Sequence, residues 1–234
     1  HEGYLRPQVA ALPELLQAGG YRTLMSGKWH LGLAPEQDPH ARGFQHSFAL
    51  LQGGHNHFGL GLTQQPTASV PRLGATYTED GKVLAKLPDD FYSSDTFATK
   101  LIEQLKNSKA GKDGKKPFFA YLAFTAPHWP LQARPQDIAK YRGKYDTGFE
   151  VLRQQRLKRQ VELGLLDPAV IAHDPVLPNG SWDSLSAEQK RTASRDMEIY
   201  AAMVDRLDQN VGRVIQTLKE TGEYDNTVIL FLAD

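Results

Sequence analysis

A lysine and a histidine two residues apart form the first group in this sequence that could do chemistry. Lys28 and His30 flank Trp29 in the string GYRTLMSGKWHLG, which runs from Gly20 to Gly32. An ammonium binds anionic oxygens and an imidazole transfers protons near neutral pH, so the pair could hold and process an anionic substrate. The same residues could instead form a turn that merely packs. The spacing alone does not decide between an anion site and a packed turn.

Two further polar residues follow apolar runs that are typical of buried strands. His128 comes after the run Phe118–Phe124 and the residues Thr-Ala-Pro, and Asp234 comes directly after Val228–Ala233. An imidazole at a strand end can transfer a proton, and a carboxylate there can bind a hard cation. Taken alone, each is also compatible with an ordinary structural role. Together with the Lys-Trp-His string they suit hydrolysis of a sulfate or phosphate ester.

Histidines are concentrated in a stretch rich in Gly, Pro and Gln that extends from Ala34 to Pro71. The pair His55-x-His57 could place two imidazoles on one side of an extended segment, as a metal site requires. No third ligand is evident in the sequence. A solvated pair on a loop is therefore the favoured interpretation.

Patterns of apolar residues indicate the elements that must hold these side chains. Helices are expected over Leu5–Ala18 and Phe149–Leu163. A third helix should carry Phe97 to Leu105, with Ser93 or Ser94 as its N-cap. A long fourth helix is expected over Met197–Leu218; it should end at Gly222 and lie against a sheet. Strands are expected over Tyr21–Met25, Phe118–Phe124 and Thr227–Ala233, with a hairpin over Tyr77–Leu84 and a long loop over Ala34–Pro71.

Two local expectations concern the site directly. The run Phe118–Phe124 is apolar nearly throughout, which indicates a central strand buried on both faces. Gly27 would let the chain bend sharply after its strand, so that Lys28, Trp29 and His30 are presented together in a turn.

Strands that alternate with helices favour a doubly wound α/β arrangement with parallel strands. Parallel strands of one sheet end at the same edge, which is where open α/β sheets bind ligands. The three strand ends would then bring the ammonium, the two imidazoles and the carboxylate together.

The charge and composition exclude several classes of protein. Lysine plus arginine equals aspartate plus glutamate at 27 each, so no global field would attract nucleic acid or an anionic membrane. The lysines between Lys106 and Lys116 are interpreted as a solvated loop. The longest apolar runs are far shorter than the roughly 20 residues of a membrane-spanning helix. Because the sequence contains no cysteine, it can form neither a disulfide nor a thiolate metal site.

The strings quoted above resemble the signatures of a known family. GYRTLMSGKWHLG resembles the second signature of the sulfatases, which reads Gly-Tyr-x-Thr, a short gap, and then Gly-Lys-Trp-His-Leu-Gly. The pair Pro127-His128 resembles the family as well, and so does Asp234, which stands where sulfatases have Asp-Asn-Gly. The chain is identified as a member of the sulfatase family, in the alkaline-phosphatase superfamily, and is most similar to the bacterial arylsulfatases. The resemblance implies an α/β fold with a large mixed, mostly parallel sheet and helices on both faces.

The resemblance also implies a mechanism. In sulfatases a cysteine or serine is oxidised to formylglycine by a formylglycine-generating or equivalent maturation enzyme, and the hydrated aldehyde attacks sulfur while one calcium ion polarises the ester. Carried over by motif, Lys28 would contact the sulfate and the nucleophile, and His30 would handle the proton of the hydrate. His128 would bind the ester oxygen and help to protonate the leaving alcohol, and Asp234 would be one of the calcium ligands. The implied substrate is a small aryl sulfate ester.

Parts of the family pattern are missing from this sequence. It has no Cys-x-Pro-x-Arg motif, and Ser69-Val70-Pro71-Arg72 is not the serine form because Leu73 stands where arginine is needed. We therefore expect residues 1–234 to be the central part of one sulfatase catalytic domain, with an incomplete sheet and with the nucleophile region and the C-terminal part outside it. Expressed alone, this segment should not hydrolyse aryl sulfates.

Three alternatives stay open on the sequence. A phosphonate or phosphate monoester hydrolase of the same superfamily shares the fold and much of the Lys-x-His string. The parent protein could also be a non-catalytic sulfatase-like protein, or a plain α/β binding module, which would leave the charged strand ends unexplained. The sequence does not identify the natural substrate, the oligomeric state or the compartment, whether bacterial cytoplasm or periplasm.

Overall fold

The computed structural model describes residues 3–63, 75–169 and 180–233 of the 234-residue chain. The helices are α1 (Leu12–Ala18), α2 (Ser93–Ala110), α3 (Pro135–Ala139), α4 (Phe149–Glu162) and α5 (Ala187–Glu220), with short 3₁₀ turns η1 (Pro35–Gln37), η3 (Trp182–Ser184) and η4 (Tyr224–Asn226). The strands are β1 (Arg22–Lys28), β2 (His46–Leu50), β3 (Tyr77–Glu79), β4 (Lys82–Val83) and β5 (Phe118–Ala123). The chain forms two compact units, of which the second comprises Leu131–Met203.

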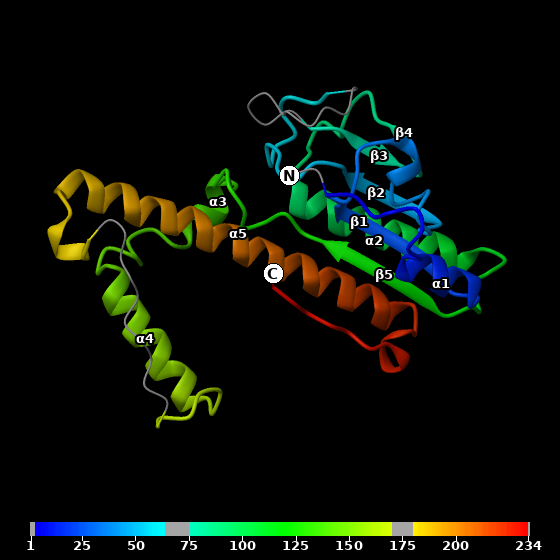
Figure 1. Ribbon diagram of the computed structural model, residues 1–234. Coiled ribbons are helices and arrows are strands. Elements are labelled where there is room, and N and C mark those ends of the chain that lie inside the picture. Colours follow the sequence, from blue (N-terminus) through cyan, green and yellow to red (C-terminus); the bar gives the residue numbers. More distant parts are fainter. Residues whose placement is uncertain (1–2, 64–74, 170–179, 234) are drawn as a thin grey trace. The chain divides into compact units, whose positions relative to one another are not determined.

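The first unit is built on one sheet with the strand order β4-β3-β2-β1-β5 (Figure 1). Strand β1 pairs in parallel with β2 on one side and with β5 on the other, whereas β3 and β4 continue the sheet in antiparallel pairs. Helices α1 and α2 both pack against β1. The mixed sheet with its helices confirms the predicted α/β fold class.

Successive residues of β1 enter different core clusters because side chains alternate across a strand. Leu24 packs with Leu101 and Leu105 of α2 and with Leu218 of α5. Met25 enters the opposite cluster, which contains Trp29 and Phe44 among others. The expected packing of the long helix against the sheet is therefore confirmed for its C-terminal half.

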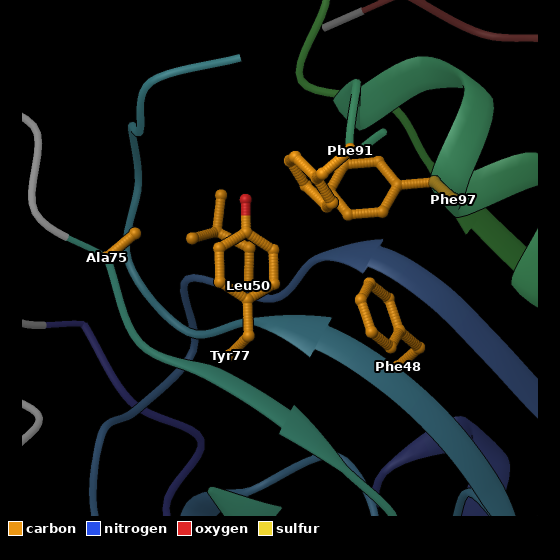
Figure 2. Packing of buried hydrophobic residues seen from close by; sticks show 6 residues of the cluster. All are labelled: Phe48, Leu50, Ala75, Tyr77, Phe91 and Phe97. Carbon is orange, nitrogen blue, oxygen red and sulfur yellow. The ribbon is translucent and has the colours of Figure 1, made fainter. Parts of the chain in front are cut away.

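A third cluster joins β2 and β3 to the start of α2 (Figure 2). The ring of Tyr77 meets that of Phe91 edge-on, with ring centroids 5.5 Å apart. The ring centroids of Phe48 and Phe97 lie 6.2 Å apart. Aromatic rings bury large apolar areas, and such pairs add to the stability that burial supplies. This cluster fixes the sheet beneath the first turn of α2.

Buried polar side chains connect the helices to the sheet. The Arg22 guanidinium, only 2% exposed, donates to the Lys116 carbonyl at 3.1 Å, to Ser108 Oγ at 2.9 Å and to Glu223 Oε1 at 2.7 Å. A buried guanidinium is tolerated only when its donors are satisfied and its charge is paired. This contact fixes the chain after α5 against the start of β1.

Helix α5 is held to the first turn of α2 by a charged pair. Arg206 donates to both carboxylate oxygens of Asp95, at 2.6 and 2.8 Å. Asn210 donates to the same carboxylate at 2.8 Å. A carboxylate in the first helical turn is also favoured by the helix dipole.

The second unit has contacts of its own. Glu198 of α5 accepts a hydrogen bond from the Gly143 backbone N–H at 2.7 Å and pairs with Arg195 at 2.8 Å. Phe149, at the start of α4, packs edge-on against Trp182. The predicted helix over Phe149–Leu163 is confirmed as α4.

The first helix is shorter than predicted, because α1 begins at Leu12 rather than Leu5. Pro13 suits the first turn of a helix, where its missing N–H costs no hydrogen bond. The residues before α1 are engaged elsewhere: the Arg42 guanidinium donates to the carbonyls of Leu5 and Val9, at 2.9 and 2.8 Å. These carbonyls therefore bind a side chain instead of extending the helix.

The region after Gly20 departs from the expectation in two ways. Strand β1 continues through Gly27 to Lys28, so Gly27 is a strand residue and not the turn. Strand β2 lies inside the stretch that was expected to be loop. Its apolar run is short, and the Gly- and His-rich residues on either side are more typical of a loop than of a strand. The part of that stretch from residue 64 onward is outside the described residues.

Two predicted buried strands are wrong as stated. Strand β5 lies at an edge of the described sheet and is only half buried, with Tyr121 46% exposed. The run Thr227–Ala233 is not a strand, and Figure 1 draws it as coil. Its apolar side chains are exposed, including Leu230 at 80% and Phe231 at 70%. A strand is stable only with a hydrogen-bonded neighbour, and no described strand pairs with this run.

The hairpin over Tyr77–Leu84 is confirmed by β3 and β4, with Asp80 and Gly81 in the left-handed region at the turn.

The expectation that Ser93 or Ser94 caps α2 is wrong, because both are the first residues of the helix and Tyr92 precedes it. Gly222, with φ of 68°, follows α5 as predicted. No helix among the described residues is both long and apolar enough to cross a membrane.

Replacing Gly27 by alanine should destabilise the protein. Gly27 has φ of 126°, and a Cβ there would overlap the backbone carbonyl of Ala123 on β5. The disfavoured backbone conformation alone costs roughly 1–3 kcal/mol, and β1 and β5 would also have to separate. The measurement is thermal and urea unfolding of the full-length protein carrying Gly27→Ala.

Gly212→Ala is the matched control, because nothing lies within 4 Å of a Cβ added at this helical glycine. Alanine there should stabilise the helix by roughly 0.5–1 kcal/mol. Equal unfolding temperatures for Gly27→Ala and the unmodified protein would contradict the tight strand contact.

Candidate functional site

Lys28 is the last residue of β1, and its neighbour Trp29 anchors the chain that follows. The indole is buried, donates through Nε1–H to the Gln37 carbonyl at 2.8 Å and meets Phe44 edge-on. Lys28 is half buried and His30 is exposed. The apolar residue between the two polar ones therefore holds the strand exit in place while both functional groups stay accessible.

His30 has an unusual backbone conformation. Its φ is 54°, in the left-handed region that non-glycine residues rarely adopt, and its N–H donates to the Leu51 carbonyl at 3.2 Å. Such conformations cost free energy and are concentrated at functional sites. The imidazole lies directly against Gly53, where a Cβ would overlap the ring and stand 2.7 Å from Nε2. The absence of a side chain at position 53 therefore makes room for the ring.

His128 lies on the loop that follows β5. Its backbone N–H donates to the Thr125 carbonyl at 2.9 Å, and its Nδ1–H donates to the Trp129 carbonyl at 2.7 Å. A carbonyl can only accept, so Nδ1 carries the proton in the neutral ring and Nε2 is left as the acceptor. The exposed imidazole can therefore exchange a proton through Nε2.

The parallel pairing of β1 and β5 brings these groups to one edge of the sheet. Gly27 stands opposite Ala123 in the register, so Lys28 leaves β1 where the chain leaves β5 toward His128. Partial desolvation lowers the pKa of His30, and the nearby charges of Lys28 and His128 lower it further. The structure thus brings Lys28, His30 and His128 together, as the sequence predicted for neighbouring strand ends. Their chemical roles remain predictions.

Asp234 and the string Ser69-Val70-Pro71-Arg72 lie outside the described residues. Within the described ranges, no three His, Asp or Glu side chains come together in a group that could hold a metal ion. The role of Asp234 as a calcium ligand therefore stays a prediction.

Both interpretations of the pair His55-x-His57 are wrong. The two imidazoles are buried, with 1% and 0% exposure, so they are not solvated. Their ring nitrogens are hydrogen-bonded to Tyr77, Thr125, Ser93 and the carbonyl of His128. Nitrogens engaged in this way have no lone pair to offer a metal. The two rings instead lie side by side, with centroids 4.7 Å apart.

Sequence reasoning missed several residues that shape this region. Gly53 follows the apolar end of β2, and Thr125 follows β5. Both positions after strands could have been noted from the sequence, since ligands bind there in α/β sheets. Ser93 gave no signal of this kind, because its contact is with a residue 36 positions away.

Comparison with known proteins places the chain among the sulfatases. The sulfatase family model matches residues 2–234. An uncharacterized sulfatase of Schizosaccharomyces pombe is 52% identical over 237 residues, covering 100% of this chain and 42% of the relative. An arylsulfatase of Klebsiella aerogenes is 39% identical over 240 residues, covering 100% of this chain and 49% of the relative. The chain thus spans less than half of either relative.

A solved structure gives independent support for the fold. The crystal structure of Ps i-CgsB in complex with k-i-k-neocarrahexaose superposes with a TM-score of 0.61 at 23% identity, covering 97% of this chain and 40% of that protein. The resemblance noted from the Lys-Trp-His string is therefore confirmed at the level of family and fold.

The buried histidines predict how stability depends on pH. Burial lowers the pKa of both His55 and His57, to well below the usual value in the case of His55. In the unfolded chain they take up protons near pH 6.5. Between that pH and the lower folded values, the unfolded state binds more protons, so the free energy of unfolding should fall as pH decreases below about 6.5.

Each histidine can contribute a slope of up to about 1.4 kcal/mol per pH unit. Urea unfolding of the full-length protein between pH 5 and 8 measures the slope. His57→Gln removes one titrating group and should make the dependence shallower. A slope that is unchanged in His57→Gln would show that this histidine does not remain neutral in the folded protein.

Proposed function

The chain belongs to the sulfatase family, and from this premise we propose that the full-length protein is an arylsulfatase that hydrolyses small aryl sulfate esters. The 39% identity to the Klebsiella aerogenes arylsulfatase supports the aryl specificity. Because this chain spans less than half of that relative, the proposal concerns the protein to which the chain belongs.

One observation supports the proposal: Lys28, His30 and His128 follow the neighbouring ends of the parallel strands β1 and β5, near enough for the charges of Lys28 and His128 to lower the pKa of His30. An ammonium is a compact positive charge that suits the anionic oxygens of a sulfate group. Imidazoles transfer protons near neutral pH. Ester hydrolysis needs both functions, because the sulfate must be held while the leaving oxygen gains a proton.

Each residue has a proposed part in the reaction. Lys28 binds the sulfate oxygens beside the nucleophile, and His30 exchanges the proton of the nucleophile. His128 binds the ester oxygen and, when its ring is protonated, donates that proton through Nε2, because Nδ1–H is held by the Trp129 carbonyl. The oxygen of the nucleophile would bond to sulfur as the bond between sulfur and the aryl oxygen breaks, and the aryl alcohol would leave with the proton from His128.

Formylglycine and one calcium ion complete the proposed site. Formylglycine would supply the nucleophile, from a cysteine or serine outside this chain that a maturation enzyme oxidises. No group of three His, Asp or Glu side chains among the described residues could hold the ion by itself, so at least part of the ligand set would come from outside them. Asp234 is the ligand that we propose from this chain.

Asp234→Ala should lower calcium affinity and activity together in the full-length protein. Calcium binds six to eight oxygens, and losing one charged ligand weakens the site as a whole. Calorimetric titration of the metal-free protein with calcium measures the affinity separately from turnover. Loss of activity with unchanged calcium affinity would show that Asp234 is not a ligand.

The role of His128 should be visible in how the rate depends on the leaving group. Nitrophenolate leaves readily, whereas phenolate leaves without a proton only at much greater cost. General-acid assistance is worth roughly 10²- to 10⁴-fold and should matter most for the poorer leaving group. His128→Ala should therefore slow phenyl sulfate far more than nitrophenyl sulfate, as kcat/KM over a series of substituted phenyl sulfates would show.

His30→Ala is the control in this series, because His30 is assigned to the nucleophile and should not steepen the dependence. Parallel slopes for His128→Ala and the unmodified protein would show that His128 only binds or packs.

Nitrophenyl phosphate and phosphonate esters, measured beside the sulfate, test the function itself. Faster turnover of these esters than of the sulfate would replace the proposal by a phosphate or phosphonate hydrolase.

A further inference from the structure

The loop that follows β2 reaches across to the loop that carries His128, and the contact is made by the buried imidazole of His57. Its Nε2 lies 3.1 Å from the carbonyl oxygen of His128, and its Nδ1 lies 2.8 Å from Ser93 Oγ. Because a carbonyl only accepts, Nε2 must carry a proton. In the neutral ring, Nδ1 then accepts from the Ser93 hydroxyl, and one tautomer satisfies both contacts.

His55 makes a second connection between the same two loops. Its Nε2 shares a hydrogen bond of 2.7 Å with Thr125 Oγ1, and its Nδ1 is hydrogen-bonded to the Tyr77 hydroxyl. Its ring also stacks on Phe97, with centroids 6.1 Å apart. Thr125 and His128 are the two ends of one backbone turn. The paired histidines therefore hold that turn at both ends.

Burial makes these contacts rigid. A charged imidazole would pay a large desolvation cost at this depth, and burial indeed lowers the pKa of both rings. Unpaired buried polar atoms are also costly, so rotating either ring away from its partners is unfavourable. The turn before His128 is thus held by neutral side chains whose orientation is fixed on both sides.

We propose that His57, assisted by His55, is a positioning residue that holds the backbone of His128 where its imidazole can protonate the leaving group. The effect on the reaction rests on the proposed sulfatase function, whereas the effect on the His128 ring does not. Ser93, in the first turn of α2, contributes to this positioning, because its hydroxyl hydrogen-bonds to Nδ1 of His57 and so fixes the tautomer of that ring.

The chain offers a matched pair of serines for the test. Ser93 and Ser94 are adjacent, both begin α2 and both are buried, with 0% and 1% exposure. Ser93 Oγ bonds to His57, whereas Ser94 Oγ has no hydrogen-bond partner among the described residues. Ser93→Ala should therefore disturb His128, and Ser94→Ala should not.

The first experiment measures kcat of the full-length protein on phenyl sulfate and nitrophenyl sulfate. A misplacement of about 1 Å can cost about 10²-fold, so His57→Leu should lower kcat on phenyl sulfate by roughly 10- to 100-fold. Nitrophenyl sulfate, which depends little on the acid, should change by less than about 3-fold. Ser93→Ala should act in the same direction but less strongly, and Ser94→Ala should match the unmodified protein.

Two further variants separate positioning from general damage. His57→Gln keeps an N–H that can donate to the His128 carbonyl, so it should recover part of the phenyl sulfate rate. In a His128→Ala background, His57→Leu should cause no further loss, because it acts only through His128. An equal fall on both substrates, or a full additional loss in the double variant, would overturn the proposal.

A second experiment does not depend on turnover. In the full-length protein labelled with ¹⁵N-histidine, correlation of ring nitrogens and protons by NMR reports the tautomer of each imidazole. We expect the Nε2–H tautomer for His57, a shift of the His128 ring signals in His57→Leu and Ser93→Ala, and unchanged signals in Ser94→Ala. An Nδ1–H tautomer for His57, or His128 signals that are unmoved in His57→Leu, would overturn the proposal. If no sulfate ester is hydrolysed, the proposed function fails while this second experiment still decides the positioning.

Discussion

The close approach of β1 and β5 at Gly27 and Ala123 is the constraint on which the candidate site depends. The two backbones meet where any Cβ on Gly27 would overlap the Ala123 carbonyl. This register decides that Lys28 and the loop toward His128 leave the sheet side by side. A shift by one residue would turn each side chain to the other face of the sheet. The position of the functional groups is thus a consequence of backbone packing.

Around this contact, the structure places polar groups in the interior and satisfies them there. Arg22 is bound by three partners, and His55 and His57 have protein partners at each ring nitrogen. Such groups contribute little net stability but are costly to leave unpaired. Their value is specificity, because only one arrangement of the loops satisfies all of them. A site that must hold two histidines near a lysine benefits from loops with a single arrangement.

The family relationship and the geometry support each other at different levels. Sulfatase membership is established by the match over residues 2–234 and by the identity to the curated relatives. The geometry adds which side chains of this chain meet, and which contacts hold them. The exposed apolar run after η4 and the half-buried edge strand β5 are surfaces that the described residues leave uncovered.

The sequence by itself determined the family, the α/β class and the main helices, and it singled out Lys28, His30 and His128 as candidate site residues, because apolar periodicity and short motifs are local signals. Only the tertiary structure decided the exposure of the last apolar run and the burial of His55 and His57. Burial depends on residues far away in the sequence: Ser93 lies 36 positions from His57, and Thr125 lies 70 positions from His55. A local pattern cannot report such contacts, since hydrogen bonding and pairing are settled only when distant segments meet.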